Sequence, residues 1–451
     1  MRGLTRKNNT VDVIVIGGGP VGAYFAGQMG SRGYSVHVFE KRKRDHVRKE
    51  LGYIHFDVPC YGELSLPRPF ADSRILKGTF TENWQIPLSE ELKFQVPCRT
   101  DILSMNGFSQ WVARHAESSG NVVFHYEAPF IRPIIGGSRV VGAEIEGCGN
   151  VYGGIVADCT GRDAVVRNSL PPECGVSPLS ARPLRTFTLH MEQWRCRGTF
   201  PRGSNTYVCY KGFANQVGPS DILVGLSTFG DLAHTRDVHR EFAARHLAGV
   251  EHRVASVYTG TVPFDFPPAS LVGDGFVSLG DAAFQNKPFN GEGIASGMEA
   301  ARIAAPVIAE ALRGGPVMRR HLWHYNAAYF RGIGAGFAKL RGICETLVDL
   351  SPREFDWLYR MKFITRKDMM AMWLKQKSVK GPLEIIRMTL NGLRNREIFK
   401  KLIDAFRLGA SLGSLYRIYP LLPAKIGGWE FRLDAILQRH GITIQKTDAV
   451  S

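Results

Sequence analysis

The stretch VDVIVIGGGPVGAYFAGQMGSRGYSVHVFEK, residues 11–41, decides the fold of this 451-residue chain. Its first six residues form an unbroken apolar run rich in β-branched side chains, which is typical of a strand buried on both faces. A glycine-rich turn follows, then a helix expected over 23–31 and a second strand expected over 35–39. Because the glycines stand between a strand and a helix, and a second strand comes next, the segment predicts a dinucleotide-binding βαβ unit.

Each glycine of the G-x-G-x-x-G spacing has a physical task in such a unit. Gly17 makes the tight turn, Gly19 lets backbone amides approach a pyrophosphate, and Gly22 permits close packing of helix on strand. The amino end of the helix then favours the negative phosphates. Glu40 should accept hydrogen bonds from ribose hydroxyls, and an acid there repels a 2′-phosphate, which favours FAD or NAD over NADP. The predicted cofactor contacts of this segment are Gly17, Gly19, Pro20, Val21, Gly22, Glu40 and Lys41.

Two further glycine-bearing turns follow predicted strands. A strand expected over 151–157 runs into Asp158-Cys159-Thr160-Gly161, and a short buried strand at 276–279 leads to Gly280 and Asp281. One nucleotide needs only the first turn, whereas a dinucleotide with a tricyclic ring has a far end that lies under other loops. FAD therefore fits the three turns together, with Asp281 at its ribityl or pyrophosphate region.

The third turn leads into a helix expected over 294–313. Gly291 and Gly293 would let backbone amides reach the pyrimidine end of the flavin, and the helix would aim its positive end at the same edge. That field stabilises the anionic reduced flavin. The cofactor contacts predicted outside the first turn are Gly161, Gly280, Asp281, Pro288, Gly291, Gly293 and Ile294. For Arg167, a cofactor contact and a surface charge remain equally open.

The patterns along the chain predict an α/β fold, α+β overall. The predicted parts are a discontinuous Rossmann-type FAD-binding domain over 1–60, 99–170 and 269–335, an inserted antiparallel, sheet-rich substrate-binding domain over 61–98 and 171–268, and a C-terminal helical region over 336–451.

Composition narrows the class of protein and of partner. The eight cysteines show neither C-x-x-C pairs nor metal-ligand spacing, so we expect reduced thiols, a cytoplasmic protein and no metal site. The longest apolar stretch, 294–312, contains charged residues and is not expected to span a membrane. The formal net charge of +16 suits anionic lipid, an acidic redox partner or simple solubility, and no motif points to nucleic acid. The basic run 41–49 is either a docking patch or a solvated loop.

Taken together, these motifs give the chain a specific likeness. It resembles FAD-dependent oxidoreductases of the class that includes aromatic hydroxylases and, within that class, is similar to the geranylgeranyl reductase family. The likeness rests on the three turns, on Pro288 followed by Gly-Glu-Gly-Ile at 291–294, and on the tail with Tyr419-Pro420 and Gly427-Gly428-Trp429.

The resemblance implies an activity and a set of partners. Reduced FAD would deliver hydride to one carbon of a C=C bond in a polyprenyl chain, and a proton would reach the other carbon. An apolar tunnel lined by Tyr207, Tyr210 and Phe289 would hold this isoprenoid lipid. Ferredoxin or NAD(P)H would supply electrons, and the basic charge would suit peripheral contact with an anionic membrane. No catalytic residue is assigned, and the proton donor stays open among His55, Tyr207 and a water.

The chain departs from the family pattern in two places. Archaeal members usually have Pro-Cys-Gly soon after the ribose acid, whereas residues 48–52 read Arg-Lys-Glu-Leu-Gly here. The substrate motif Y-x-W-x-F-P is matched by residues 207–212, Tyr-Val-Cys-Tyr-Lys-Gly, only at its first tyrosine. Two other classes therefore stay open. One is a flavin monooxygenase that hydroxylates an aromatic or polyketide substrate, and the other is an electron-transfer flavoprotein that docks through its basic face.

Overall fold

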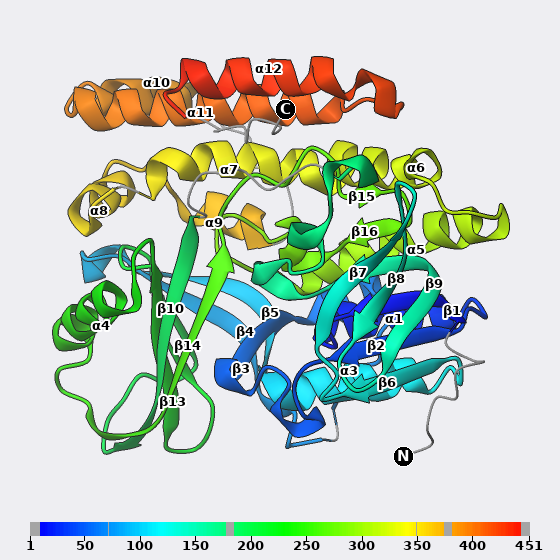
Figure 1. Cartoon of the computed structure of the whole chain (residues 1–451). Helices are drawn as coiled ribbons and strands as arrows, with labels where there is room; N and C mark the ends of the chain where they lie inside the picture. The colour runs from blue at the N-terminus through cyan, green and yellow to red at the C-terminus, as the bar shows by residue number, and fades with distance from the viewer. Residues whose placement is uncertain (1–9, 71, 177–184, 349, 374–380, 443–451) are drawn as a thin grey trace.

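A computed structural model describes residues 10–70, 72–176, 185–348, 350–373 and 381–442. Two sheets lie beside each other, helices cover both of them, and a pair of long helices with a shorter one forms the outermost layer (Figure 1). The predicted mixed α/β fold is confirmed. The predictions for residues 1–9, 177–184, 374–380 and 443–451 lie outside the described residues.

The first sheet is built around the βαβ unit predicted from residues 11–41. Its strand order is β15-β16-β9-β1-β2-β6, and β1 pairs in parallel with β2 and with β9. The strands are β1 (Thr10–Ile16), β2 (Val36–Glu40), β6 (Val122–Tyr126), β9 (Gly149–Asp158), β15 (Val272–Gly273) and β16 (Phe276–Ser278). Side chains from β1 are buried on both faces, as the unbroken apolar run predicted.

Different elements cover the two faces of this sheet. On one face pack the helices α1 (Pro20–Gly30), α3 (Met105–Glu117) and α5 (Ile294–Arg313), with α1 between the other two. The other face has its own apolar cluster and is extended by the hairpin of β7 (Phe130–Gly136) and β8 (Arg139–Ile145), which pairs with β9. Three helices thus cover one face of the sheet and a hairpin extends the other. The glycine turns lie at the edge formed by the carboxyl ends of the strands.

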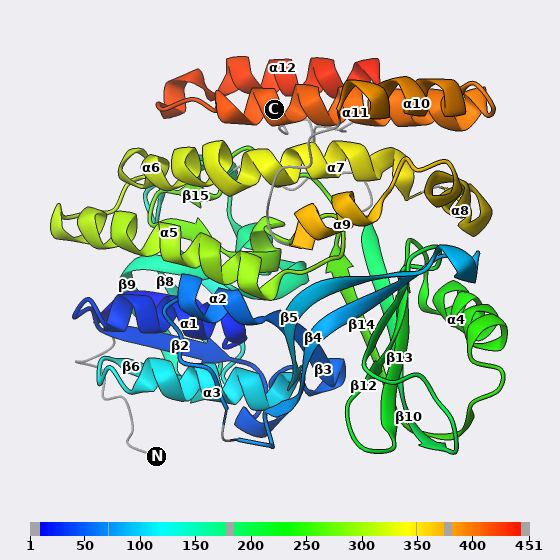
Figure 2. The same ribbon diagram turned by 180° about the vertical axis from the view of Figure 1, so that it is seen from behind.

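The second sheet is almost wholly antiparallel, with strand order β14-β10-β13-β12-β11-β4-β5-β3. Its strands are β3 (Tyr53–Asp57), β4 (Leu76–Ile86), β5 (Phe94–Ser104), β10 (Thr186–Arg197), β11 (Ser204–Tyr207), β12 (Gly212–Gln216), β13 (Asp221–Thr228) and β14 (Glu251–Pro263). Helix α4 (Leu232–His246) covers one face, seen at the outer side of the sheet in Figure 2. The sheet therefore includes β3, which lies before the predicted domain boundary at 61, and the whole of β5, which continues past the predicted boundary at 98. Tyr53 of β3 pairs with Ser104 of β5.

The described residues after 318 are mainly helical, as predicted. The helices are α6 (Arg319–Tyr329), α7 (Ala335–Leu347), α8 (Pro352–Arg360), α9 (Arg366–Trp373), α10 (Pro382–Gly392), α11 (Arg396–Arg417) and α12 (Ile426–Arg439). Leu412, Tyr416 and Trp429 of α11 and α12 belong to the same buried apolar cluster as α1, so this region shares its core with the first sheet. None of the helices in the described ranges has the length and apolar character needed to cross a bilayer.

Candidate flavin site

The first glycine turn leaves no space for a side chain at Gly17 or at Gly22. Gly17 has φ +103°, and a Cβ atom there would stand 2.3 Å from the carbonyl oxygen of Cys159 at the end of β9. A Cβ atom on Gly22 would stand 2.1 Å from the carbonyl oxygen of Gly17. The start of α1 is therefore held directly against the ends of β1 and β9, with Pro20 in the first helical turn.

The ends of three neighbouring strands bring the three glycine turns together. In the sheet register Ile16 of β1 pairs with Asp158 of β9, and Asp158 pairs with Ser278 of β16. The turns at 17–22, 158–161 and 280–283 begin at these residues or within two residues after them. Their shared position at the carboxyl edge of a parallel sheet is where open α/β sheets bind ligands.

Glu40 ends β2 beside the first turn and is 5% exposed. Its Oε2 accepts a hydrogen bond from the Gly18 N–H at 2.9 Å, and its Oε1 accepts one from the Arg42 N–H at 2.9 Å. The acid predicted to meet a ribose thus also fixes the glycine turn. Lys41 next to it is exposed.

Arg48 is a site residue that the sequence analysis missed. Its backbone adopts a left-handed conformation, with φ +54°, and its guanidinium points into the space between the first two turns. A Cβ atom on Gly19 would lie 3.8 Å from Arg48 Nε, and one on Gly161 would lie 2.8 Å from Nη2. A guanidinium between the amino end of α1 and Gly161 suits a pyrophosphate, because both the helix end and the cation favour negative charge.

The other basic residues of the run 41–49 differ from Arg48. Arg42 pairs with Glu50 at 3.0 Å, Lys43 with Glu127 at 3.8 Å and Arg44 with Glu117 at 2.9 Å. These partly exposed pairs neutralise much of the charge that a docking patch would need, and they favour the solvated-loop interpretation of this run.

Asp281 faces the same space from the third turn. Its Oδ1 lies 2.7 Å from the place of a Cβ atom on Gly293, and its side chain makes no hydrogen bond or ion pair with the part of the chain that the structure describes. Burial raises the pKa of this carboxyl, and the positive charge of Arg48 opposes that shift. A partly buried carboxylate without a protein partner fits a hydroxyl donor such as a ribityl chain.

The amino end of α5 differs from the prediction in its electrostatics. The Glu292 carboxylate accepts hydrogen bonds from the Ala295 N–H and the Ser296 hydroxyl, each at 2.6 Å, and burial raises its pKa. The positive helix end expected to act on the flavin therefore already faces one carboxyl group of its own. Gly291 and Gly293 stand just before this helix, and Ile294 is its first residue.

The loop 285–290, which contains Phe289 of the predicted substrate tunnel, is held mainly by internal hydrogen bonds. Gln285 is fully buried; its Oε1 accepts a hydrogen bond from the Gly280 N–H, and its Nε2 donates one to Tyr325. Asn286 donates to the Pro263 carbonyl at 2.6 Å. Phe289 is 40% exposed.

An apolar pocket adjoins this loop. Pro288, Phe264, Phe284 and Tyr329 are among its lining residues. Arg341 also lines it and places its guanidinium 3.6 Å from the centre of the Phe264 ring. Aromatic walls with a single cationic group suit an apolar molecule that has a polar end.

Two of the predicted substrate residues lie elsewhere. Tyr207 packs against Phe242 of α4, with ring centres 5.0 Å apart, and the Tyr210 hydroxyl donates to Glu241 of α4 at 2.7 Å. Both rings thus lie on the face of the second sheet that α4 covers. The structure does not bring them together with Phe289 or Pro288. The sequence could not predict this, because an alternating strand pattern shows that a strand has two different faces but not which face meets the ligand.

Arg167 corrects a further expectation. It is 3% exposed, and its guanidinium donates to the Ser278 hydroxyl at 2.9 Å and to the Ser270 carbonyl at 2.8 Å. Its backbone N–H donates to Asp158 at 2.8 Å. Neither a cofactor contact nor a surface charge describes it, because the side chain ties together the strands beneath the turns.

His55, one of the candidate proton donors, is an exposed residue of β3. Its Nε2 lies 2.6 Å from Nδ2 of Asn215, and desolvation by the surrounding protein lowers its pKa to about 4. The ring is therefore neutral at pH 7, with Nε2 as the acceptor of the asparagine N–H.

The sequence of this chain is similar to those of known reductases. No protein-family model matches the chain. It is 23% identical to the digeranylgeranylglycerophospholipid reductase of Sulfolobus acidocaldarius, over 96% of this chain and 98% of that protein. It is 26% identical to digeranylgeranylglycerophospholipid reductase 1 of Methanopyrus kandleri, over 76% of this chain and 92% of that one. The resemblance predicted from the sequence is confirmed by these relatives.

Solved structures share the fold. A geranylgeranyl bacteriochlorophyll reductase-like protein from Thermoplasma acidophilum superposes with a TM-score of 0.70 at 18% identity, covering 88% of this chain and 99% of that one. A flavin-dependent brominase has a TM-score of 0.59 at 17% identity, covering 94% and 99%. A probable FAD-dependent monooxygenase from Pseudomonas aeruginosa has a TM-score of 0.55 at 17% identity, covering 75% and 97%. The predicted fold of FAD-dependent oxidoreductases is confirmed.

Proposed function

We propose that this chain is an FAD-dependent reductase that transfers hydride to C=C bonds of a polyprenyl chain on a lipid or related isoprenoid. The observation that supports this most is the convergence of three glycine turns on Arg48 and Asp281, in a chain similar to a reductase of that kind over 96% of its length. The proposal extends to the cofactor, the substrate and the surface that meets the lipid.

Each group of the site has one task toward FAD. Arg48 and the amino end of α1 would hold the pyrophosphate, Glu40 the ribose, and Asp281 the ribityl hydroxyls. The amides around Gly291 and Gly293 would meet the pyrimidine edge of the ring. When bound and reduced, the flavin supplies the hydride. The chain's own residues bind and orient it and keep water away from the ring.

The pocket beside Pro288 offers apolar walls to the proposed substrate, but its volume is about 20 Å³, so it has to widen before a polyprenyl chain can enter. Its walls are mostly apolar, so a polyprenyl chain gains free energy by leaving water, about 25 cal/mol for each Å² of apolar surface buried. Arg185 and Arg341 lie over the ring of Phe264, and Lys211 lies over Phe229, which stacks on the same aromatic group. Glu345 pairs with both arginines, and Asp265 also lines the pocket, so cationic and acidic side chains both stand near the place proposed for a lipid headgroup with phosphate.

The outermost helical layer would bring the enzyme to its lipid. Helices α10, α11 and α12 form the outermost layer in Figure 1. These helices and the connections between them carry large apolar side chains that are each more than half exposed: Leu383, Ile385, Ile386, Leu390, Leu393, Phe406, Ile418, Leu421, Leu422 and Phe431. Residues 381–442 also contain ten basic and five acidic side chains. Apolar groups among basic ones are typical of helices that lie on an anionic bilayer.

A vesicle assay tests this surface. Leu383→Ser with Leu390→Ser should lower binding to vesicles containing phosphatidylserine, because two exposed apolar groups no longer enter the interface. Ile131→Ser, at a half-exposed apolar residue of β7 in the first sheet, is the control and should bind as wild type. Equal binding of all three proteins would remove the membrane contact from the proposal.

The proposed reductase activity is tested by measuring the mass of the lipid product. The purified flavoprotein is reduced without oxygen and mixed with a geranylgeranylated glycerophospholipid, and mass spectrometry measures the gain of two hydrogen atoms for each bond reduced. Absence of any mass gain in the lipid, together with tight FAD binding, would reject the reductase and retain the flavin site.

A flavin monooxygenase is the second candidate, favoured by the fold shared with a probable FAD-dependent monooxygenase. Oxygen uptake that depends on both NAD(P)H and an added aromatic compound would support it. In the reductase, oxygen uptake should not respond to the aromatic compound.

A further inference from the structure

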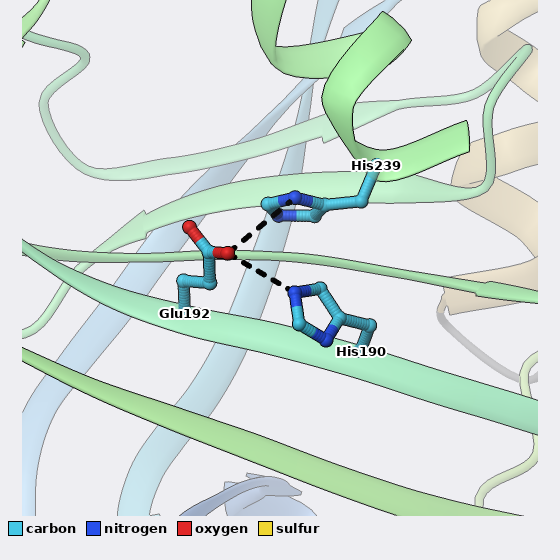
Figure 3. Close-up of side chains that lie close together, drawn as sticks. All are labelled: His190, Glu192 and His239. Atoms are coloured by element: carbon cyan, nitrogen blue, oxygen red, sulfur yellow. Dashed lines mark hydrogen bonds and ion pairs between the residues drawn. The ribbon is translucent and has the colours of Figure 1, made fainter. Parts of the chain in front are cut away.

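Three side chains of the second sheet converge outside the flavin site. His190 and Glu192 are two residues apart on β10, so they point to the same face of the strand, and His239 comes from α4, which covers that face. Figure 3 shows the three side chains directed toward one another. His190 Nε2 lies 3.1 Å and His239 Nδ1 4.0 Å from Glu192 Oε1, and one donor atom from each residue lies within 4.8 Å of the others.

Outer contacts fix the orientation of two of these groups. His239 Nε2 lies 3.3 Å from the carbonyl oxygen of Val224, which can only accept, so Nε2 carries the proton and the neutral ring directs the Nδ1 lone pair at Glu192. The other oxygen of Glu192, Oε2, accepts a hydrogen bond from Trp194 Nε1 at 2.7 Å. A neutral ring would thus direct a nitrogen lone pair at a carboxylate oxygen, which is unfavourable unless a metal cation or a proton on Nδ1 lies between them.

We propose that His190 Nε2, Glu192 Oε1 and His239 Nδ1 bind one divalent transition-metal ion, Zn²⁺, which joins α4 to the second sheet. Two imidazole nitrogens and one carboxylate oxygen are a donor set that zinc prefers, with a water in the fourth position. Zinc bonds of about 2.0–2.2 Å place ligand atoms roughly 3.3 Å apart, so only His239 has to move closer. The Val224 carbonyl and the Trp194 N–H are the outer partners that metal-binding histidines and carboxylates usually have.

The site is separate from the proposed flavin chemistry. Phe187 of β10, close to Gly291 of the third turn, points to the face opposite to His190. His190 and His239 are 4% and 2% exposed, whereas Glu192 is partly exposed and leaves a path for the ion. The expectation of no metal site rested on the cysteines, and a His-x-Glu pair with its third ligand 47 residues later has no recognisable local spacing. The ion would hold α4 in place rather than react with substrate.

Zinc titration of the full-length chain tests the proposal. The protein is stripped with a chelator and titrated with Zn²⁺ against a coloured competitor, and metal content is measured by mass spectrometry. Wild type should bind one Zn²⁺ per chain and melt at a higher temperature with Zn²⁺ than without it. His239→Gln and Glu192→Gln should lose this binding, whereas His234→Gln, an exposed position of the same helix, should keep it.

The outer contacts give a graded second measurement. Trp194→Phe removes the N–H that holds Glu192 Oε2, together with part of a buried ring, and should weaken Zn²⁺ binding roughly 10–100-fold. Should the ligand variants fail to fold, the visible spectrum of Co²⁺ in the wild-type protein decides, since a four-coordinate site gives intense bands. Wild type without stoichiometric metal, or variants that all bind equally, would overturn the proposal. In the first case His239 would be held as an imidazolium paired with Glu192.

Discussion

At two glycines near the ends of β1 and β9 there is no room for a side chain. The second sheet, in contrast, is joined to neighbouring loops and to α8 through buried charged groups. At Gly17 and Gly22 backbone meets backbone. In the second sheet Arg68 reaches Asp101 of β5, and Asp356 of α8 reaches Ser89. Changes in the first region should therefore displace the backbone and disturb flavin binding. Changes in the second should leave a buried polar group without its partner and lower stability alone.

The largest effect is expected from Arg68→Ala. Asp101 is fully buried, and its carboxylate accepts hydrogen bonds from Arg68 Nε at 2.7 Å and from Thr79 Oγ1 at 2.7 Å. Removal of the guanidinium leaves a buried charge uncompensated, so the free energy of unfolding should fall by about 3–5 kcal/mol, as urea denaturation measures. Arg74→Ala is the control, because Arg74 pairs with Asp72 at the surface, and its loss should leave stability nearly unchanged.

Gly17→Ala should have the second largest effect on stability. Unlike Arg68→Ala, it should also abolish flavin binding. Its Cβ atom would collide with the Cys159 carbonyl at a φ of +103°, which together cost about 3 kcal/mol and push β9 away from α1. Flavin content after purification, read from its visible absorbance, should be lost with this variant and kept with Arg68→Ala.

Gly33→Ala separates backbone strain from collision. Gly33 also has positive φ, at +87°, but a Cβ atom there meets nothing within 4 Å. Flavin content equal to wild type is expected. If Gly17→Ala also kept its flavin, the close approach of β9 and α1 would not be needed for binding.

Arg48→Ala changes the first region without a collision. Loss of a charge-assisted contact to pyrophosphate should weaken FAD binding by about 1.5–3 kcal/mol, roughly 10–100-fold in Kd, with little change in stability. Fluorescence titration of the apoprotein with FAD measures it. Arg44→Ala, whose side chain pairs outward with Glu117, should bind FAD as wild type. An equal loss in both variants would instead support a general effect of the basic run 41–49.

These regions also differ in how far the sequence predicts them. Gly17, Gly22 and Glu40 follow from a local spacing, because backbone geometry allows few alternatives there. Arg48 looks like any other member of its basic run, and only its left-handed backbone turns it inward. In the second sheet the partner of each group lies far along the chain. The pairing of Tyr210 with Glu241 is therefore invisible before the strands are assembled.

The smallest effect is expected at Asp356 and depends on pH. Burial alone would raise the pKa of this carboxyl, but hydrogen bonds from Arg360 and from the backbone and hydroxyl of Ser89 outweigh it and lower the pKa below its usual value. Stability from a lowered carboxyl pKa is complete above the unfolded value, about 3.9, and is lost as pH falls through the lower, folded value. Asp356→Asn should thus reduce the free energy of unfolding by about 1 kcal/mol at pH 7, and the difference from wild type should shrink below about pH 4. Urea denaturation at both pH values measures this, and a difference that stays constant with pH would show that shape rather than charge holds α8 to Ser89.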